Sequence, residues 1–267
     1  MRRCLFILAV VFLLILPSPV AYAQTASPDA TPLPALSDLK DQYRKSLDDE
    51  RAKEDQFSIA SQQYYTLQTL AAESDAVRAA REVDLARVDT LLIYLQTLHT
   101  TLDTNLGIEL SRKTTLEQQL DLLVDTLKRH RARVEIATNR IQIEQENVFL
   151  ANQEATIEGL CYEALALIKI GAVQAALDQL VLTQQSVNDY IASAPISETT
   201  RTDKQRGSDE VSRSIDTIKQ ILSDAMNTYD SNIQHSDSTL LTQVQGVLGP
   251  AYANLTQSLE FIKELSQ

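Results

Sequence analysis

The chain has 267 residues, a net charge of −12 at pH 7, 44% hydrophobic residues and no tryptophan. An acidic surface of this kind repels nucleic acid and anionic lipid, so the composition argues against both as partners. Six glycines leave little material for active-site loops, whereas the hydrophobic content is ample for burying the faces of helices. The composition therefore favours an elongated helical bundle over an enzyme.

Residues 1–23 have the pattern of a secretory signal peptide. Two arginines precede an apolar stretch over residues 4–16, prolines follow it, and Ala21-Tyr22-Ala23 is a small-x-small cleavage site. We predict cleavage after Ala23 and a secreted, periplasmic or cell-envelope location. The alternative is an uncleaved anchor, which would be the only membrane contact. Cleavage removes two arginines and no acidic residue, so it changes the net charge from −12 to −14.

The next segment, residues 24–36, is rich in proline, threonine and serine and reads as a disordered spacer. A first helical arm is predicted over residues 37–106, with Ser37 as its N-cap. Apolar residues then recur in one heptad register, without proline, from Leu85 to Ala155. Such a register makes helices wrap around one another as a coiled coil.

Signals for a turn interrupt this register between residues 107 and 113. Gly107 is suited to the left-handed position after a helix, and Thr114 with Glu117 fits the capping box that starts another helix. The adjacent polar core positions Glu109 and Lys113 fall between the two signals. They predict a hairpin turn over 107–113 and a second arm over 114–192.

Two all-α architectures are compatible with this pattern. We favour a long antiparallel coiled-coil hairpin, because it buries its seam within one chain and its two arms are nearly equal in length. The alternative is a continuous helix that forms a parallel coiled-coil dimer. In the hairpin, His99 faces roughly residue 121 and His130 roughly residue 90.

The second arm changes character over residues 157–182, where apolar residues spread beyond one stripe and predict more than one neighbouring helix. A polar linker over 193–207 and C-terminal helices over 208–267 follow. The first of these helices is expected to stop near Gly246, and Gly249-Pro250 to begin a short second one. We expect the C-terminal helices to pack on the base of the hairpin.

Three sets of residues are candidates for interactions. The apolar stripe of the third helix could bind a protein partner by helix packing, through Val211, Ile215, Ile218 and Leu222. The strongest basic run could contact a polyanion through Lys128, Arg129 and Arg133, although nearby glutamates dilute its charge. Cys161, the one cysteine of the mature chain, could form an intermolecular disulfide, or it could be a small buried residue.

No catalytic motif, cofactor motif or metal-ligand spacing is found; His99 and His130 each lack a second ligand four residues on. We therefore expect a non-enzymatic exported scaffold, spacer or adaptor with a protein partner, and a homodimer is possible. One alternative is an accessory arm similar in architecture to the coiled-coil activators of wall hydrolases. Another is a membrane-inserting or pore-forming protein that uses residues 157–182.

Overall fold

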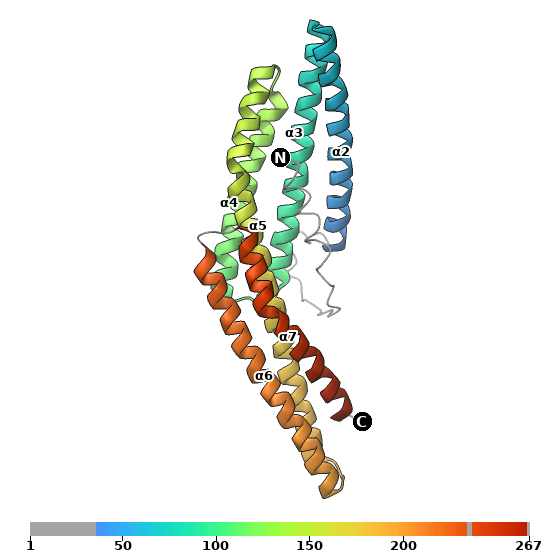
Figure 1. Ribbon diagram of the computed structural model, residues 1–267, viewed down its shortest axis with the longest axis vertical. Coiled ribbons are helices and arrows are strands. Elements are labelled where there is room, and N and C mark those ends of the chain that lie inside the picture. The colour runs from blue at the N-terminus through green and yellow to red at the C-terminus, as the bar shows by residue number, and fades with distance from the viewer. Residues whose placement is uncertain (1–35, 234–236, 266–267) are drawn as a thin grey trace, which may run out of the picture. The chain divides into compact units, whose positions relative to one another are not determined.

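The computed structural model describes residues 36–233 and 237–265, and this part of the chain is helical without any strand (Figure 1). The all-α prediction is therefore confirmed. The predicted signal peptide and all of the predicted spacer except Leu36 lie outside the described residues. The elements are α2 (Leu36–Leu67), α3 (Leu70–Thr104), α4 (Leu110–Ile136), α5 (Arg140–Ser193), α6 (Glu198–Asn232) and α7 (Ser238–Leu265).

The predicted first arm is two helices rather than one. α2 ends at Leu67, and Gln68 takes a left-handed backbone with φ of 50°. Thr69 then caps α3, because its hydroxyl accepts a hydrogen bond from the amide of Ala72 at 3.3 Å. α2 and α3 therefore form a hairpin, and a single arm over 37–106 is wrong.

Contacts between α2 and α3 show that the two helices are antiparallel. Lys53 Nζ lies 2.8 Å from a carboxylate oxygen of Glu82. Farther from the turn, the rings of Tyr43 and Tyr94 are 5.4 Å apart. Lower residue numbers on α2 thus pair with higher residue numbers on α3. The two helices therefore run in opposite directions, and one face of each packs against the other.

The predicted turn near residue 110 is confirmed, but it covers residues 105–109 instead of 107–113. His99 Nε2 lies 3.7 Å from Asp121, and Arg131 Nε lies 2.6 Å from Asp89. These pairs are the ones that a turn near 110 predicts. Helix α4 begins five residues earlier than the Thr114 capping box suggests, because its N-cap is Glu109, where no side-chain cap bond forms.

A further turn interrupts the predicted second arm. α4 ends at Ile136, and Asn139 starts α5 by accepting a hydrogen bond from the amide of Gln142 at 3.0 Å. α4 and α5 then run antiparallel, with His130 beside Glu146. A single arm over 114–192 is therefore wrong. The breaks at 68–69, 105–109 and 137–139 also rule out the alternative of one continuous helix.

The C-terminal helices pack on the second half of α5. Gln184 of α5 donates to the carbonyl of Ser208 at 3.0 Å and to the hydroxyl of Ser212 at 2.7 Å on α6. α7 packs against both α5 and α6. Helix α5 itself is buried on nearly all sides over residues 161–171. The prediction that the wide apolar face of this segment has several neighbours is thus confirmed.

Three boundaries in this region differ from the prediction. The helix expected to run to near Gly246 is divided, because α6 ends at Asn232 and α7 begins at Ser238. The linker over 193–207 shrinks to residues 194–197, because the hydroxyl of Ser197 caps α6 by accepting from the amide of Thr200 at 3.1 Å. The break expected at Gly246 is absent, and α7 continues through Pro250. The proline removes one backbone hydrogen bond. Leu248 and Ala251, on either side of it, are buried, so packing outweighs that loss.

Candidate functional site

The predicted docking stripe on α6 is covered by the chain itself. Val211, Ile215, Ile218 and Leu222 are buried, and α6 packs against α5 and α7. The stripe exists because an amphipathic helix must bury its apolar face. Here the chain supplies the neighbouring helices, so we correct the expectation that these four residues are exposed to a partner.

The basic residues on α4 do not form an open patch. Arg133 Nε donates to Glu146 of α5 at 2.9 Å, and its guanidinium lies 4.6 Å from the ring centre of Phe149. Lys128 and Arg129 are exposed, and Arg129 donates to the hydroxyl of Thr126. Because Glu146 neutralises Arg133, the three predicted polyanion residues are not brought together as one free cationic surface.

Cys161 is a buried free thiol. Burial raises its pKa to about 12, with the charge of Glu158 adding to the effect. The thiolate is the form that reacts in disulfide exchange, so the folded chain offers no reactive sulfur at this position. The reading of Cys161 as a small buried residue fits the structure, and the intermolecular disulfide does not.

Charged side chains are buried between the helices α2, α3, α4 and α5. Glu50 of α2 and Asp84 of α3 flank the guanidinium of Arg87, at 3.5 and 3.8 Å. His130 of α4 lies 2.9 Å from Glu146 of α5, and Glu146 is near enough to Asp84 to raise its pKa. We call these five residues the buried charged layer. Each of the four helices contributes to it.

Burial sets the protonation of this layer. It raises the pKa of Asp84 to about 6 and also raises that of Glu50, while Arg87 opposes both shifts. It lowers the pKa of His130, so the ring is neutral at pH 7. A carboxylate can only accept, so Nδ1 of the neutral ring is the donor to Glu146.

Three polar atoms of the layer have no hydrogen-bond partner within the described residues: Oε2 of Glu50, Oδ2 of Asp84 and Nε2 of His130. Buried charges of this kind usually cost stability, and they are known to fix the register of packed helices. No group of three or more potential metal ligands occurs in residues 36–233 and 237–265. We assign the layer a structural role in aligning the four helices.

The turn between α3 and α4 is seated directly on α5. Asn105 donates from Nδ2 to the carbonyl of Ile168 at 3.1 Å, and its Oδ1 accepts from the amide of Gly107 at 3.1 Å. A Cβ added to Gly107 would overlap the carbonyl oxygen of Gly171 and lie 2.7 Å from the amide nitrogen of Ala175. Gly107 has no positive φ. The predicted left-handed role is therefore wrong, and this glycine serves a close backbone approach.

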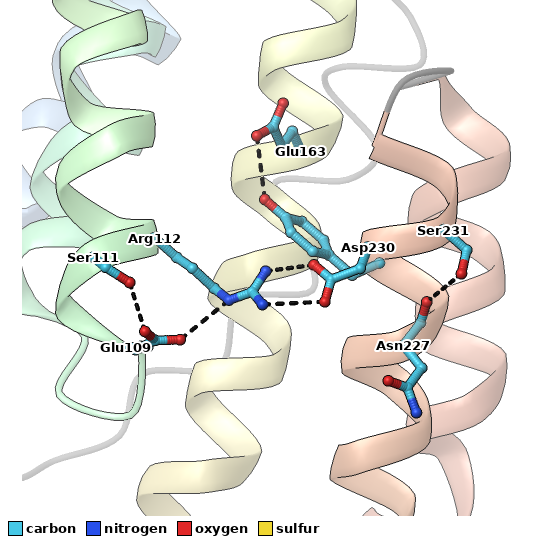
Figure 2. Close-up of polar contacts among 8 residues, drawn as sticks. Glu109, Ser111, Arg112, Glu163, Asn227, Asp230 and Ser231 are labelled. Atoms are coloured by element: carbon cyan, nitrogen blue, oxygen red, sulfur yellow. Dashed lines mark hydrogen bonds and ion pairs between the residues drawn. The ribbon is translucent and has the colours of Figure 1, made fainter.

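Polar contacts join the same turn to α6. Figure 2 shows Arg112 between two carboxylates: its Nε donates to Glu109 at 3.2 Å, and its two terminal nitrogens donate to Asp230 of α6, one of them at 3.1 Å. Deeper in the structure, the hydroxyl of Tyr229 donates to Glu163 of α5 at 3.2 Å. Burial raises the pKa of Glu163. These contacts hold α4, α5 and α6 together at one position.

The end of the α2–α3 hairpin combines exposed apolar side chains with an absence of charge. From Gln56 to Ala72 there is no acidic residue, basic residue or histidine. Within this segment, which we call the hairpin end, Ile59, Tyr65, Leu67 and Leu70 are 59%, 73%, 61% and 85% exposed. Interface cores are depleted of charged residues and enriched in tyrosine. The hairpin end therefore has the composition of a binding surface.

The sequence contains the signal for this surface, because the charge-free run follows a densely charged stretch over residues 38–55. A continuous arm, however, would have placed residues 56–72 mid-helix, so the run gave no reason to expect a hairpin end.

Comparison of the chain with models of protein families, with curated proteins and with solved structures finds no match.

Proposed function

We propose that the mature chain is a non-enzymatic helical adaptor of the cell envelope or extracellular space, and that it binds a protein partner through the hairpin end. The observation that supports this proposal is the charge-free run of residues 56–72 with large apolar side chains exposed on it. The chain has 22% charged residues. A partner that covers a surface without charge does not have to desolvate any charged group, so binding there costs less free energy. The export signal in residues 1–23 supports the compartment.

The chemistry of the hairpin end favours a protein over a lipid bilayer. Phe57, Ile59, Tyr65, Leu67 and Leu70 supply apolar and aromatic contact area. The same segment carries four glutamines and four serine or threonine hydroxyls, and polar groups without partners in hydrocarbon cost several kcal/mol each. At a protein interface these groups can hydrogen-bond across the contact. The mixture therefore fits a helix-packing partner.

Helix α5 bears on the membrane-inserting alternative. By length and composition it could cross a membrane, and half of its apolar window is buried. Glu163, within the proposed insertion segment 157–182, is hydrogen-bonded to Tyr229 of α6 in the core, so release of the segment would also break this contact with α6. A buried core helix accounts for the same composition, and we favour that explanation. The likeness to activators of wall hydrolases depended on two unbroken arms, and within the described residues each predicted arm is divided into two helices.

Site-specific photocrosslinking in cells that make the protein tests the proposed function. A photoreactive amino acid replaces Tyr65 on the hairpin end or, as the matched control, Tyr252 on α7; both tyrosines are exposed, at 73% and 44%. We expect discrete protein adducts from position 65 that position 252 does not give. If position 65 yields only the products seen at position 252, the hairpin end is not a binding surface and the proposal fails.

A further inference from the structure

The α2–α3 hairpin extends beyond the turn that joins α4 to α5. Arg81 of α3 donates to the carbonyl of Ala137 in that turn at 3.4 Å, which places the turn at the level of residue 81. Helix α3 begins at Leu70, so the hairpin projects by about 17 Å at 1.5 Å per residue. Residues of this projection lack the neighbours that α4 and α5 provide farther along.

One face of α2 becomes more exposed along this projection. Tyr43, Glu50, Phe57 and Tyr64 are seven residues apart and so share a face of the helix. Tyr43 and Glu50 are 4% and 2% exposed, whereas Phe57 is 36% exposed. The face that the chain covers with its own helices thus continues, less fully covered, into the hairpin end. An occupant would extend packing that already exists.

The α4–α5 turn beside the projection is also apolar. Ile136 and Ile141, on either side of this turn, are 75% and 67% exposed. The α4–α5 pair reaches less far toward this end than the projecting hairpin, so the two hairpins form a step. Phe57 and Tyr64 lie on the side of the step, and the two isoleucines lie at its base. Two copies of a step fit together about a two-fold axis, because the projection of each fills the recess of the other.

Charge distinguishes a second copy from other occupants. The mature chain has a predicted net charge of −14, so two copies repel one another when most of their surfaces approach. The hairpin end carries no charge over residues 56–72, and on the α3 side of the projection the two acidic residues Glu73 and Asp75 are balanced by Arg78 and Arg81. On α5, Arg140 beside the turn is paired with Glu144 at 2.6 Å. Self-association at this end therefore meets little of the repulsion that a net charge of −14 creates between two copies.

We propose that two copies of this chain associate through their hairpin ends, each projection packing into the step of the other. This inference rests on the proposed adaptor function and names its partner at that surface. Two helices about 10 Å wide over a 17 Å projection give a buried surface on the order of 1,000–1,500 Å² in total, which is near the lower limit of stable specific interfaces. The expected complex is a dimer with a dissociation constant in the micromolar range.

Sedimentation velocity on the chain from Gln24 onward, across a hundredfold range of concentration, tests the dimer. The wild-type chain should pass from monomer to dimer. A variant with Leu67→Glu and Leu70→Glu should bind itself at least tenfold more weakly, because each interface would bury four carboxylates without partners. The control places the same change at Leu182 and Leu259, both 56% exposed on other helices, and should dimerise like the wild type.

Crosslinking through position 65 separates this proposal from the adaptor function. A mixture of two differently tagged copies should give an adduct that carries both tags. A wild-type chain that stays monomeric, or a Leu67/Leu70 variant that dimerises as tightly as the wild type with an unchanged circular dichroism spectrum, overturns the dimer. If the chain is monomeric and position 65 captures a different protein, the dimer fails while the adaptor function stands. If it captures nothing, both fail.

Discussion

Replacing Gly107 by alanine tests whether the α3–α4 turn is fixed by its approach to α5. The added Cβ would overlap the carbonyl oxygen of Gly171 and lie 2.7 Å from the amide nitrogen of Ala175. Both are backbone atoms inside a helix that is buried on nearly all sides, so they cannot move as a flexible side chain can. The turn itself must lift away from α5.

The size of the effect follows from what the turn would lose. Ile108 is 8% exposed, and partial exposure of such a side chain costs about 1–2 kcal/mol. Breaking the hydrogen bond from Asn105 to the carbonyl of Ile168 costs about 1 kcal/mol more. Alanine recovers roughly 0.4–1 kcal/mol by restricting the unfolded chain. The net loss of unfolding free energy is therefore about 1–3 kcal/mol, or a fall in Tm of roughly 3–10 °C.

Thermal unfolding followed by circular dichroism measures this change, and Gly246→Ala provides the matched control. Gly246 lies inside α7, and a Cβ there would meet nothing within 4 Å. Alanine should therefore raise the unfolding free energy by up to about 1 kcal/mol through helix propensity. In Gly107→Ala, amide hydrogen exchange should also rise around residues 105–109. A Gly107→Ala chain that melts at or above the wild-type temperature would refute the reasoning.

Three other changes probe the remaining features. Because burial raises the pKa of Asp84 to about 6, the folded chain takes up a proton before the unfolded chain does. Lowering the pH from 7.5 to 5 should thus raise the unfolding free energy of the wild type by about 1.4 kcal/mol relative to that of Asp84→Asn, as measured by urea titration. An equal pH dependence of the two proteins would contradict the raised pKa of Asp84. Cys161 should react with a thiol reagent only at the rate of unfolding, and rapid labelling of the native chain would show that it is accessible. Gln68→Gly should raise Tm, because glycine adopts φ of 50° at roughly 1 kcal/mol less cost than glutamine; a lower Tm would count against the left-handed turn.

The sequence was sufficient to predict the helical class and one of the turns. Gly107, with polar residues at Glu109 and Lys113, marked a position where the coiled-coil seam could not continue. From that turn alone the pairing of His99 with residue 121 followed, and His99 does lie 3.7 Å from Asp121. Local stop signals and the antiparallel geometry of a hairpin determine this part of the structure.

The turn at 137–139 was missed because the heptad pattern continues through it. Ala137, Ile141 and Val148 keep the predicted register, yet Ile141 and Val148 are 67% and 61% exposed. The residues actually buried in α5 are Ile143 and Leu150, two positions later along the helix. Asn139 followed by Gln142 was a capping signal, and it outweighed the apolar repeat because a capped turn lets α5 pack on α4.

The turn at 68–69 could not be predicted from its own residues. Gln68 adopts the left-handed conformation that glycine or asparagine usually supplies, so no local signal marked it. The apolar spacing of Phe57, Ala60, Tyr64, Leu67 and Ala71 is interrupted over residues 74–80, and this interruption was the only sign of a change. The buried charged layer was likewise hidden, because Glu50 reads as one of many charged residues in the first arm, and only packing from four helices shows that it is 2% exposed.

These turns decide where apolar surface is left over. A straight coiled coil covers its seam along its whole length, and it needs a second chain to do so. Folding back at 68–69, 105–109 and 137–139 lets one chain cover most of its own seam, but hairpins of unequal reach cannot cover their ends. The α2–α3 hairpin projects past the α4–α5 turn, and charge is absent from residues 56–72 at its end, although Glu73, Asp75 and Arg78 follow on α3. A projection that merely met solvent would not require that absence, since the charged stretch over 38–55 shows that this helix readily carries charge. The exposed apolar residues and the missing charge therefore have one explanation if the hairpin end is covered by a partner.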